Sequence, residues 1–376
     1  MMERKRMKPR ADWRKQLDDL GFHFHSADGG YWDESACYHF TAAEIDMLES
    51  VTAELHEMSI AAAKAVIEGG RFERFALDPW FADYLARSWN DDAPSLYGRF
   101  DLCYDGKNPP KLLEYNADTP TSLIEAAIAQ WNWQQQCFPA ADQFNSIHEK
   151  LIARWAEIRD ELGNPPLHLA CTKDSEEDFC NVEYLRDTAL QAGINARHLY
   201  IEDIGWSDRD GFFCDLEGNP VRALFKLYPW EWIMNEKFGT NFPAAGIAVI
   251  EPAWKLLLSS KAILPALWEL YPDHPNLLPA YFEPGRLPER HVRKPVYSRE
   301  GANVELHGPR GVFSRPGTYG AEGHIYQGYS PLPLMDANYP VIGSWVIGGV
   351  PAGIGIREDV NPITTNMSRF VPHYFD

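Results

Sequence analysis

The chain has 376 residues, of which 45% are hydrophobic and 13% aromatic, so it can bury a large core. By length it divides into about two or three lobes. Its formal net charge of -19 excludes a body that binds nucleic acid, because phosphates would be repelled. Residues 1–16 differ, since Lys and Arg dominate there. We expect this basic N-terminal arm to be solvated; contact with nucleic acid or anionic lipid is the alternative.

No apolar run follows the arm, so we expect no secretory signal. The longest apolar stretch, residues 340–356, is interrupted by Ser344, prolines and glycines, which predicts paired strands rather than a membrane span. The six cysteines are scattered and form no CxxC, which predicts reduced thiols and no zinc site. The sequence therefore predicts a cytoplasmic protein without a membrane partner.

Residues 41–69 predict a long amphipathic helix, with a Thr-x-x-Glu capping box at its start and two glycines at its end. Residues 96–104 and 111–116 predict two strands, which are joined by a turn rich in Gly, Asn and Pro. A helix is expected over 122–135.

The order of elements changes after residue 166. A strand over 167–172, a helix over 176–192 and a strand over 194–201 predict a small parallel α/β lobe. After residue 251 we expect a helix over 255–268, several strands and a Gly-rich hairpin near the C-terminus. No repeat or low-complexity linker separates these parts, so the lobes should pack into one unit.

The two strands near residues 100 and 114 carry the first candidate site. Side chains alternate faces along a strand, so Glu114 and Asn116 point the same way, and Asp101 joins them if the strands pair. Two carboxylates and an amide oxygen suit magnesium, with nucleotide phosphates completing its shell. Arg99 shares a face with Asp101 and would place a cation beside those phosphates. The alternative is a solvated hairpin with a surface ion pair.

Separated basic residues form the second candidate, because phosphoryl transfer needs positioning and charge neutralisation. Lys261 follows two serines at a helix start, and Lys294 and Arg299 flank a short strand that ends in a glycine loop. Exposed basic residues at element ends are the alternative. No GxxxxGK[ST] loop and no complete GxGxxG occurs, so neither a P-loop enzyme nor a dinucleotide fold is supported.

Two further candidates lie elsewhere. Arg357 ends the C-terminal hairpin, where its guanidinium could bind a carboxylate or a phosphoryl group; an ion pair with Glu358 or Asp359 is the alternative. Glu176 and Glu177 open a predicted helix. They either stabilise the helix N-terminus or form a carboxylate pocket for a cationic amine.

Four motifs resemble, in this order, the synthetase domain of the glutathionylspermidine synthase family. The resemblance runs from about Trp13 onwards and covers nearly the whole chain. The motifs are Arg-Phe-Asp at 99–101, Leu-Leu-Glu-Tyr-Asn-Ala-Asp-Thr-Pro-Thr at 112–121, Val-Arg-Lys-Pro-Val-Tyr-Ser-Arg-Glu-Gly at 292–301 and Gly-Ile-Arg-Glu-Asp at 355–359.

The resemblance implies an α+β protein with an ATP-grasp fold and an attached lobe like the pre-ATP-grasp domain. It implies that ATP and magnesium drive the joining of an acid to an amine through an acyl phosphate. It also assigns residues to each part of the site. Those residues are Asp101, Glu114 and Asn116 for magnesium; Arg99, Asp101, Lys261, Lys294 and Gln327 for the nucleotide; Arg99, Arg299 and Arg357 for catalysis; Thr119 and Thr121 for the acid; and Glu176 and Glu177 for the amine.

The order of these residues is unusual for an ATP-grasp enzyme, which places its lysines before its acidic metal ligands. We therefore expect a circularly permuted, discontinuous body within a single unit over 17–376. Its parts span about 90–165 and 251–376, and the α/β lobe over about 166–250 is inserted between them.

The substrate side departs from the family. The segment from Lys226 to Glu231 only partly follows the pattern Lys-x-Trp-x-Trp-Glu, and we expect no amidase domain. The sequence thus predicts a carboxylate–amine ligase whose acid, a small molecule or peptide, and whose amine are not identified, with no nucleic-acid partner. The alternatives are a true glutathionylspermidine synthase and a nucleotide-binding regulatory protein without ligase chemistry.

Overall fold

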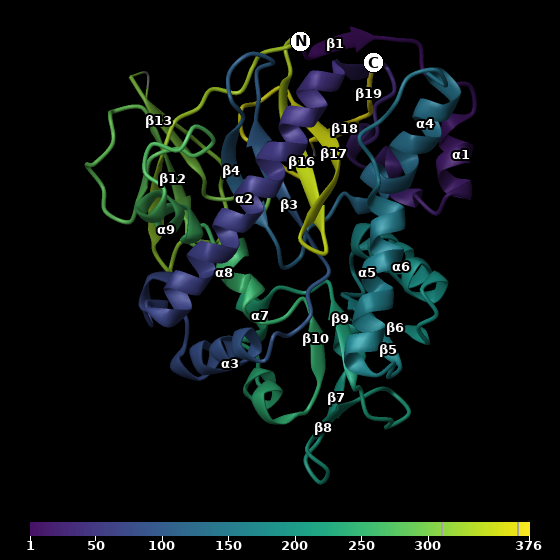
Figure 1. Ribbon diagram of the computed structural model, residues 1–376, viewed down its shortest axis with the longest axis vertical. Helices are drawn as coiled ribbons and strands as arrows, with labels where there is room; N and C mark the ends of the chain where they lie inside the picture. The colour runs from purple at the N-terminus through teal and green to yellow at the C-terminus, as the bar shows by residue number, and fades with distance from the viewer. Residues whose placement is uncertain (310, 367) are drawn as a thin grey trace.

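The computed structural model describes residues 1–309, 311–366 and 368–376, and its centre is a five-stranded antiparallel sheet (Figure 1). The strand order β18-β17-β16-β3-β4 joins the predicted hairpin near residue 100 to the C-terminal hairpin. Both predicted hairpins are therefore confirmed, and they pair with each other through β16 and β3. The strands are β3 (Tyr97–Cys103), β4 (Lys111–Asn116), β16 (Tyr339–Ile347), β17 (Val350–Asp359) and β18 (Arg369–Val371).

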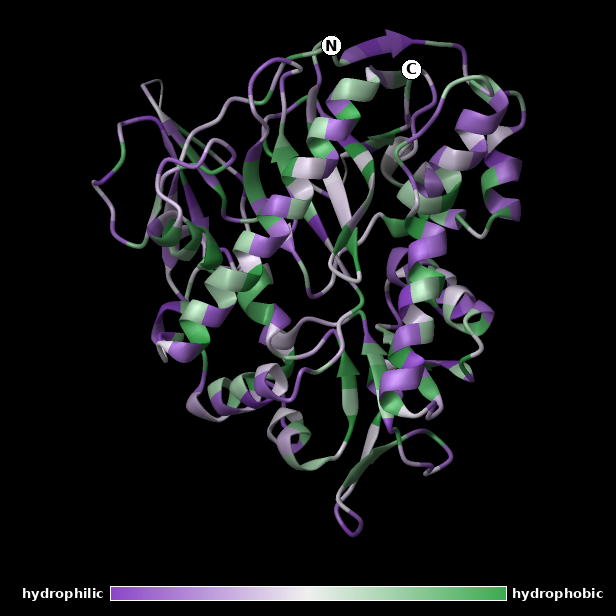
Figure 2. Cartoon of the chain, viewed as in Figure 1, coloured by the Kyte–Doolittle hydropathy of each residue, from purple (hydrophilic) through white to green (hydrophobic). Residues whose placement is uncertain are grey.

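The long helix α2 (Ala42–Glu68) crosses this sheet and packs on β16 and β17 (Figure 1). The predicted capping box is present, because Thr41 accepts from the backbone of Glu44 and the Glu44 side chain accepts from Thr41. Its buried positions, among them Leu48 and Leu55, recur at helical spacing. In Figure 2 hydrophobic and hydrophilic residues accordingly alternate in patches along the helix.

A second antiparallel sheet, in the order β11-β15-β12-β13-β14, lies beside the central sheet (Figure 1). The single helix expected over 255–268 is instead two helices with a break at Ser260. Ser260 is extended there, and the backbone N–H of Lys261 donates to the carbonyl oxygen of Val296. Its elements are α8 (Lys255–Ser259), α9 (Ile263–Leu270), β11 (Ala280–Tyr281), β12 (His291–Pro295), β13 (Glu305–Gly308), β14 (Gly311–Ser314) and β15 (His324–Gly328).

The predicted parallel α/β lobe is confirmed as a four-stranded sheet in the order β10-β9-β5-β6. Helices α5 and α6 pack on one side of it in Figure 1. The elements of the lobe are β5 (Leu167–Cys171), α6 (Glu176–Gln191), β6 (Ala196–Tyr200), β7 (Gly205–Ser207), β8 (Phe212–Cys214), β9 (Ala223–Lys226), α7 (Trp230–Ile233) and β10 (Ala248–Ile250), with α5 (Ile147–Leu162) packed on α6. Earlier in the chain come α3 (Pro79–Asn90), the π-helical turn η3 (Glu125–Ala129) and α4 (Gln130–Cys137).

The N-terminal residues do not form the expected solvated arm. Strand β1 (Glu3–Arg6) pairs with β2 (Ala36–Phe40), which also pairs with β19 (His373–Phe375), and α1 (Trp13–Asp19) follows. Both chain ends thus lie close together at the top of Figure 1. The prediction of a solvated arm was wrong because the acidic partners of these basic residues lie elsewhere in the chain and cannot be recognised from the local sequence.

Glu358 is the main partner of this segment. Its carboxylate is 0% exposed and accepts from Arg4 Nε and Nη2, each at 2.8 Å, from the Tyr38 hydroxyl at 2.7 Å and from Arg369 Nη2 at 3.0 Å. The alternative for Arg357, an ion pair with Glu358 or Asp359, is not found among the described residues; Arg357 pairs with Asp101 instead. Glu358, as its neighbour on the strand, faces the opposite side. Through Glu358, Arg4 therefore ties the N-terminal strand β1 to β17, and Arg369 ties β18 to the same carboxylate.

All six cysteines are free thiols. Across the described ranges, no helix combines the length and the apolar character that crossing a membrane requires.

Replacing Glu358 by Ala should lower the free energy of unfolding by about 3–5 kcal/mol, because Arg4 and Arg369 lose a shared buried counter-charge. Urea denaturation followed by circular dichroism measures this loss. Asp336→Ala is the matched control, since it removes a partly exposed partner of Arg4 at 3.4 Å. An equal effect of the two variants would contradict the buried-pair account.

Candidate active site

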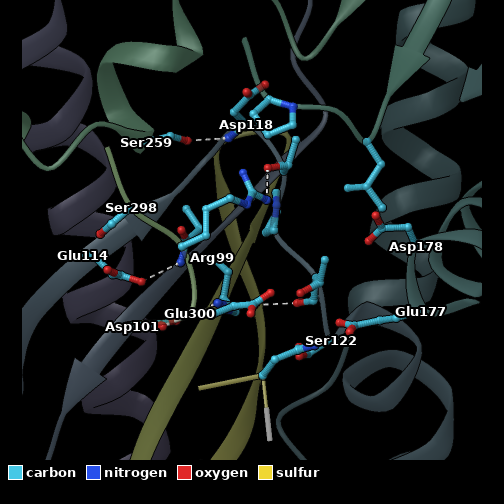
Figure 3. Close-up of a pocket in the computed structure, with 18 of the residues that line it drawn as sticks. Arg99, Asp101, Glu114, Asp118, Ser122, Glu177, Asp178, Ser259, Ser298 and Glu300 are labelled. Carbon is cyan, nitrogen blue, oxygen red and sulfur yellow. Dashed lines mark hydrogen bonds and ion pairs between the residues drawn. The ribbon is translucent and has the colours of Figure 1, made fainter. Parts of the chain in front are cut away.

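A cavity of about 330 Å³ opens where the central sheet, the parallel lobe and the second sheet meet (Figure 3). Its walls come from residues 118–122, 227–229, 231–232, 297–301 and 364–366, together with side chains of β3, β4, α6 and β17. A second cavity of about 110 Å³ lies between the two antiparallel sheets. Asp101 and Glu114 line both cavities and so mark their junction.

The strand pairing brings the predicted magnesium residues together. Asp101 lies opposite Glu114 and Arg99 opposite Asn116 in the β3–β4 register. Asp101 is buried between two guanidinium groups: Arg99 Nε donates to Oδ1 at 2.8 Å and Arg357 Nη2 donates to Oδ2 at 2.7 Å. The fold thus brings Arg357 to Asp101, although the two residues are 256 positions apart in the chain.

Glu114 faces the basic side of the junction. Lys261 Nζ lies 3.3 Å from its Oε2, and Asn116 Nδ2 donates to its Oε1 at 3.1 Å. Desolvation would raise the pKa of Glu114, but Lys261 and Lys294 outweigh it and lower that pKa to about 2. Glu114 is therefore ionised at neutral pH and can bind a cation.

The donor set fits magnesium. Within the described residues, no group of three or more His, Cys, Asp and Glu side chains is placed to hold a metal ion. A magnesium site here would use the carboxylates of Asp101 and Glu114 together with the amide oxygen of Asn116. Such a hard oxygen set is typical of magnesium, which keeps further positions for phosphate oxygens and water.

The second cavity has a basic end and an apolar wall. Lys294 Nζ donates to the carbonyl oxygen of Leu113 at 2.8 Å, and Gln327 Nε2 donates to that of Leu112 at 3.1 Å. Burial lowers the pKa of Lys294 to about 8, although Glu114 opposes this shift. The apolar part of the lining consists of Leu113, Val292, Val304, Leu306, Leu332, Val341 and Ile363.

Arginines and threonines meet in the first cavity. Arg299 Nη2 donates to Thr119 Oγ1 at 2.7 Å, and Arg99 Nη1 donates to the carbonyl oxygen of Thr121 at 2.5 Å. Gly301 has φ +70, and a Cβ atom there would meet the carbonyl oxygen of Thr364 at 2.6 Å. A glycine is therefore required where the Arg299 loop packs on the C-terminal segment.

A buried ion pair that the sequence did not reveal fixes the threonine segment. Lys226 Nζ donates to Asp118 Oδ1 at 2.6 Å, and both side chains are at most 2% exposed. Asp118 Oδ2 also accepts from the backbone N–H of Trp230 at 2.9 Å, while Ser259 Oγ accepts from the N–H of Asp118 at 2.7 Å. In the sequence, this pair could be suspected only because Asp118 and Lys226 each lie in a segment that resembles a motif of the family.

The acidic residues divide between the cavity and solvent. Glu177 and Asp178 line the first cavity and lie across from Glu114 and Asp101 in Figure 3, whereas Glu176 is exposed and does not line it. Desolvation raises the pKa of Glu177 to about 7 and that of Asp178 to about 6. The structure therefore favours Glu177 and Asp178, rather than Glu176 and Glu177, as an acidic wall.

The chain belongs to the glutathionylspermidine synthase family. The family profile described as "Glutathionylspermidine synthase preATP-grasp" matches residues 4–376, which confirms the resemblance drawn from the sequence motifs. A Haemophilus influenzae protein named "Putative acid–amine ligase" is 45% identical over 97% of both chains.

More distant relatives are larger. Trypanothione synthetase from Crithidia fasciculata is 27% identical, with 83% of this chain and 52% of that protein covered. The bifunctional glutathionylspermidine synthetase/amidase of Escherichia coli is 26% identical, with 96% and 63% covered. This chain therefore spans about half to two thirds of these two enzymes.

The fold also has a solved counterpart. A glutathione synthetase-like effector from Globodera pallida, in its apo form, aligns with a TM-score of 0.58 over 97% of this chain and 96% of that one, at 11% identity. At this identity the likeness shows a shared mixed α/β fold.

Asp118→Asn should lower the free energy of unfolding by about 3–5 kcal/mol, since it leaves the Lys226 ammonium buried without a full counter-charge. Urea denaturation measures the loss. Asp19→Asn serves as the control, because Asp19 pairs with Lys15 on the exposed surface and should not shift the midpoint. A wild-type midpoint for Asp118→Asn would contradict the anchoring role.

Proposed function

We propose that this protein is an ATP- and magnesium-dependent ligase that joins a carboxylic acid to an amine through an acyl phosphate. The observation that carries the proposal is the junction of two cavities at Asp101 and Glu114. The second cavity has an apolar wall that suits an adenine ring, and it also contains Lys294 and Gln327, which suit the phosphates and the polar edge of a nucleotide. The other is polar and holds three arginines, as a carboxylate that accepts a phosphoryl group requires.

The nucleotide would lie across the junction. Its base would pack on the apolar wall of the second cavity, with Gln327 beside it. Lys294 and Lys261, both buried at the basic end, would neutralise its phosphates. Asp101, Glu114 and Asn116 would hold magnesium, which neutralises phosphate charge and aligns the phosphoryl group for transfer.

The acid would bind among the arginines of the first cavity. Thr119 and Thr121 flank this region, and Arg299 is already oriented by its bond to Thr119. An ionised carboxylate here faces Arg99 and Arg357, whose fork geometry suits carboxylate and phosphoryl oxygens. These arginines would stabilise the charge that develops during transfer, and the enclosed cavity would keep water from the acyl phosphate.

The amine would enter from the acidic wall. Glu177 and Asp178 face the arginine side across the cavity, so a cationic amine held between them points towards the acyl group (Figure 3). The pKa of Glu177, about 7, suits a base that removes a proton from the attacking nitrogen near neutral pH.

We also propose that the fold is an ATP-grasp fold in circularly permuted order. Its parts span about 90–165 and 251–376, with the lobe over about 166–250 inserted. The pairing of β3 with β16 supports this division, because it builds one sheet from both parts.

The function is tested by incubating the protein with Mg-ATP, hydroxylamine and a panel of acids that includes glutathione. The proposal predicts an acid-dependent hydroxamate with release of ADP. Glu114→Ala should abolish both products while the circular dichroism spectrum stays unchanged. If Glu114→Ala still releases ADP, the assignment of Glu114 as a metal ligand is wrong. ATP binding without any hydroxamate would favour a regulatory protein.

The panel also separates the two ligase candidates. Hydroxamate formed from glutathione, followed by product formation with spermidine, would identify a true glutathionylspermidine synthase. Tyr228, which stands where the family pattern has Trp, favours a different substrate pair.

Arg299→Ala should lower kcat by about 10²–10³-fold and change ATP affinity little, because the guanidinium acts on charge that develops in the transition state. Steady-state kinetics and nucleotide titration measure the two effects separately. The control is Arg293→Ala, which breaks an ion pair with Glu305 away from the cavity. Equal losses in kcat and ATP affinity for Arg299→Ala would contradict the assignment.

A further inference from the structure

Glu125 is a buried carboxyl group that the proposed reaction does not yet use. It begins the π-helical turn η3, its side chain is 0% exposed, and within the described ranges neither of its carboxylate oxygens has a hydrogen-bond partner. Buried polar groups are almost always paired, because an unpaired one destabilises the fold. Single π-helical turns are common at functional sites.

The surrounding contacts place Glu125 beside the amine end of the cavity. The hydroxyl groups of Tyr31 and Ser122 lie 3.0 Å apart, and both residues line the cavity next to Glu177. The backbone N–H of Leu123 donates to Asn181 Oδ1 at 3.1 Å, and Asn181 Nδ2 donates to the carbonyl oxygen of Glu177 at 2.9 Å. The turn that carries Glu125 and the helix that carries Glu177 are therefore tied together.

The electrostatic surroundings keep Glu125 neutral. Burial, together with the neighbouring Glu177, raises the pKa of Glu125 to about 8. The Tyr31 hydroxyl and the Arg99 guanidinium lower it, but Arg99 is already bonded to Asp101. These two groups offset burial and Glu177 only in part, so the pKa of Glu125 stays above its ordinary value.

We propose, on the basis of the ligase function above, that Glu125 is a positioning residue for the acceptor amine, which keeps a proton while the amine site is free and releases it to solvent when an ammonium group binds beside Glu177. The only bond that breaks in this step is the O–H bond of the Glu125 carboxyl group, and water or buffer takes up the proton. The ammonium group replaces the proton as the positive charge near the two carboxyl groups. The site thereby selects a cationic amine over a neutral nucleophile.

Proton release on amine binding tests this directly. Isothermal titration calorimetry with spermidine, 1,4-diaminobutane and lysine, each in phosphate and in Tris buffer at pH 7, gives the number of protons released. The wild-type protein should release up to one proton more per bound amine than Glu125→Gln. Equal release, or no binding of any of the three amines, would overturn the inference.

A second measurement requires no ligand. The folded-state pKa of Glu125, about 8, exceeds the ordinary value of 4.5, so between these values the folded protein holds a proton that the unfolded chain has lost. Its stability therefore falls as pH rises from about 4.5 towards 8 and levels off above 8. The melting temperature of the wild-type protein should therefore drop more steeply between pH 5.5 and 8.5 than that of Glu125→Gln. Glu149→Gln, at an exposed position, should follow the wild type. Parallel curves for all three proteins would overturn the inference.

These outcomes are separable from the fate of the ligase proposal. Hydroxylamine is mostly neutral at pH 7, so hydroxamate formation by the wild-type protein tests the ligase function without requiring a cation in the amine site. A hydroxamate formed without Glu125-linked proton release would leave the ligase function standing and remove only the role of Glu125.

Discussion

The structure depends on the antiparallel pairing of β3 with β16, which joins an early hairpin to the C-terminal hairpin. This pairing places Arg357 on the same carboxylate as Arg99, and Asp101 is thereby held with its charge compensated at the centre of the cleft. A buried carboxylate without such partners would be protonated or would destabilise the sheet. Asp101, on β3, lines both cavities, so the same strand pairing contributes to the core and to the site.

The two sides of the cleft treat charge differently. On the nucleotide side Glu114 has Lys261 within 3.3 Å, and its pKa is about 2. On the opposite side the pKa values of Glu177 and Glu125 are about 7 and about 8, because their desolvation is less compensated. Under the proposed function, the first side would bind anionic phosphates together with a metal ion, and the second would receive a cationic ligand as its counter-charge.

Local patterns in the sequence predicted the parts of the fold that depend on local physics. Strand alternation predicted that Asp101, Glu114 and Asn116 share a face, and the capping box of α2 and the β5–α6–β6 order are visible in residue type and spacing. The strand pairing between distant hairpins has no local signature, because either hairpin could pair elsewhere.

Features that depend on tertiary contacts were missed. Glu125 lies within a run that fits an ordinary helix, and nothing local shows that its carboxyl group is unpartnered. Asp118 and Lys226 are 108 residues apart, so their bond depends on the folded chain. The N-terminal arginines looked solvated because Glu358 and Glu34, which bind Arg4 and Arg10, lie far from them in sequence.

The central claim is that the carboxylate of an acid attacks ATP in this cleft. The most direct measurement uses the acid that yields a hydroxamate, labelled with ¹⁸O in both carboxylate oxygens, and follows the label by ³¹P NMR during turnover with an amine. An acyl phosphate predicts that one ¹⁸O atom from each acid appears in inorganic phosphate. Phosphate that contains no ¹⁸O, while amide forms, would contradict the account.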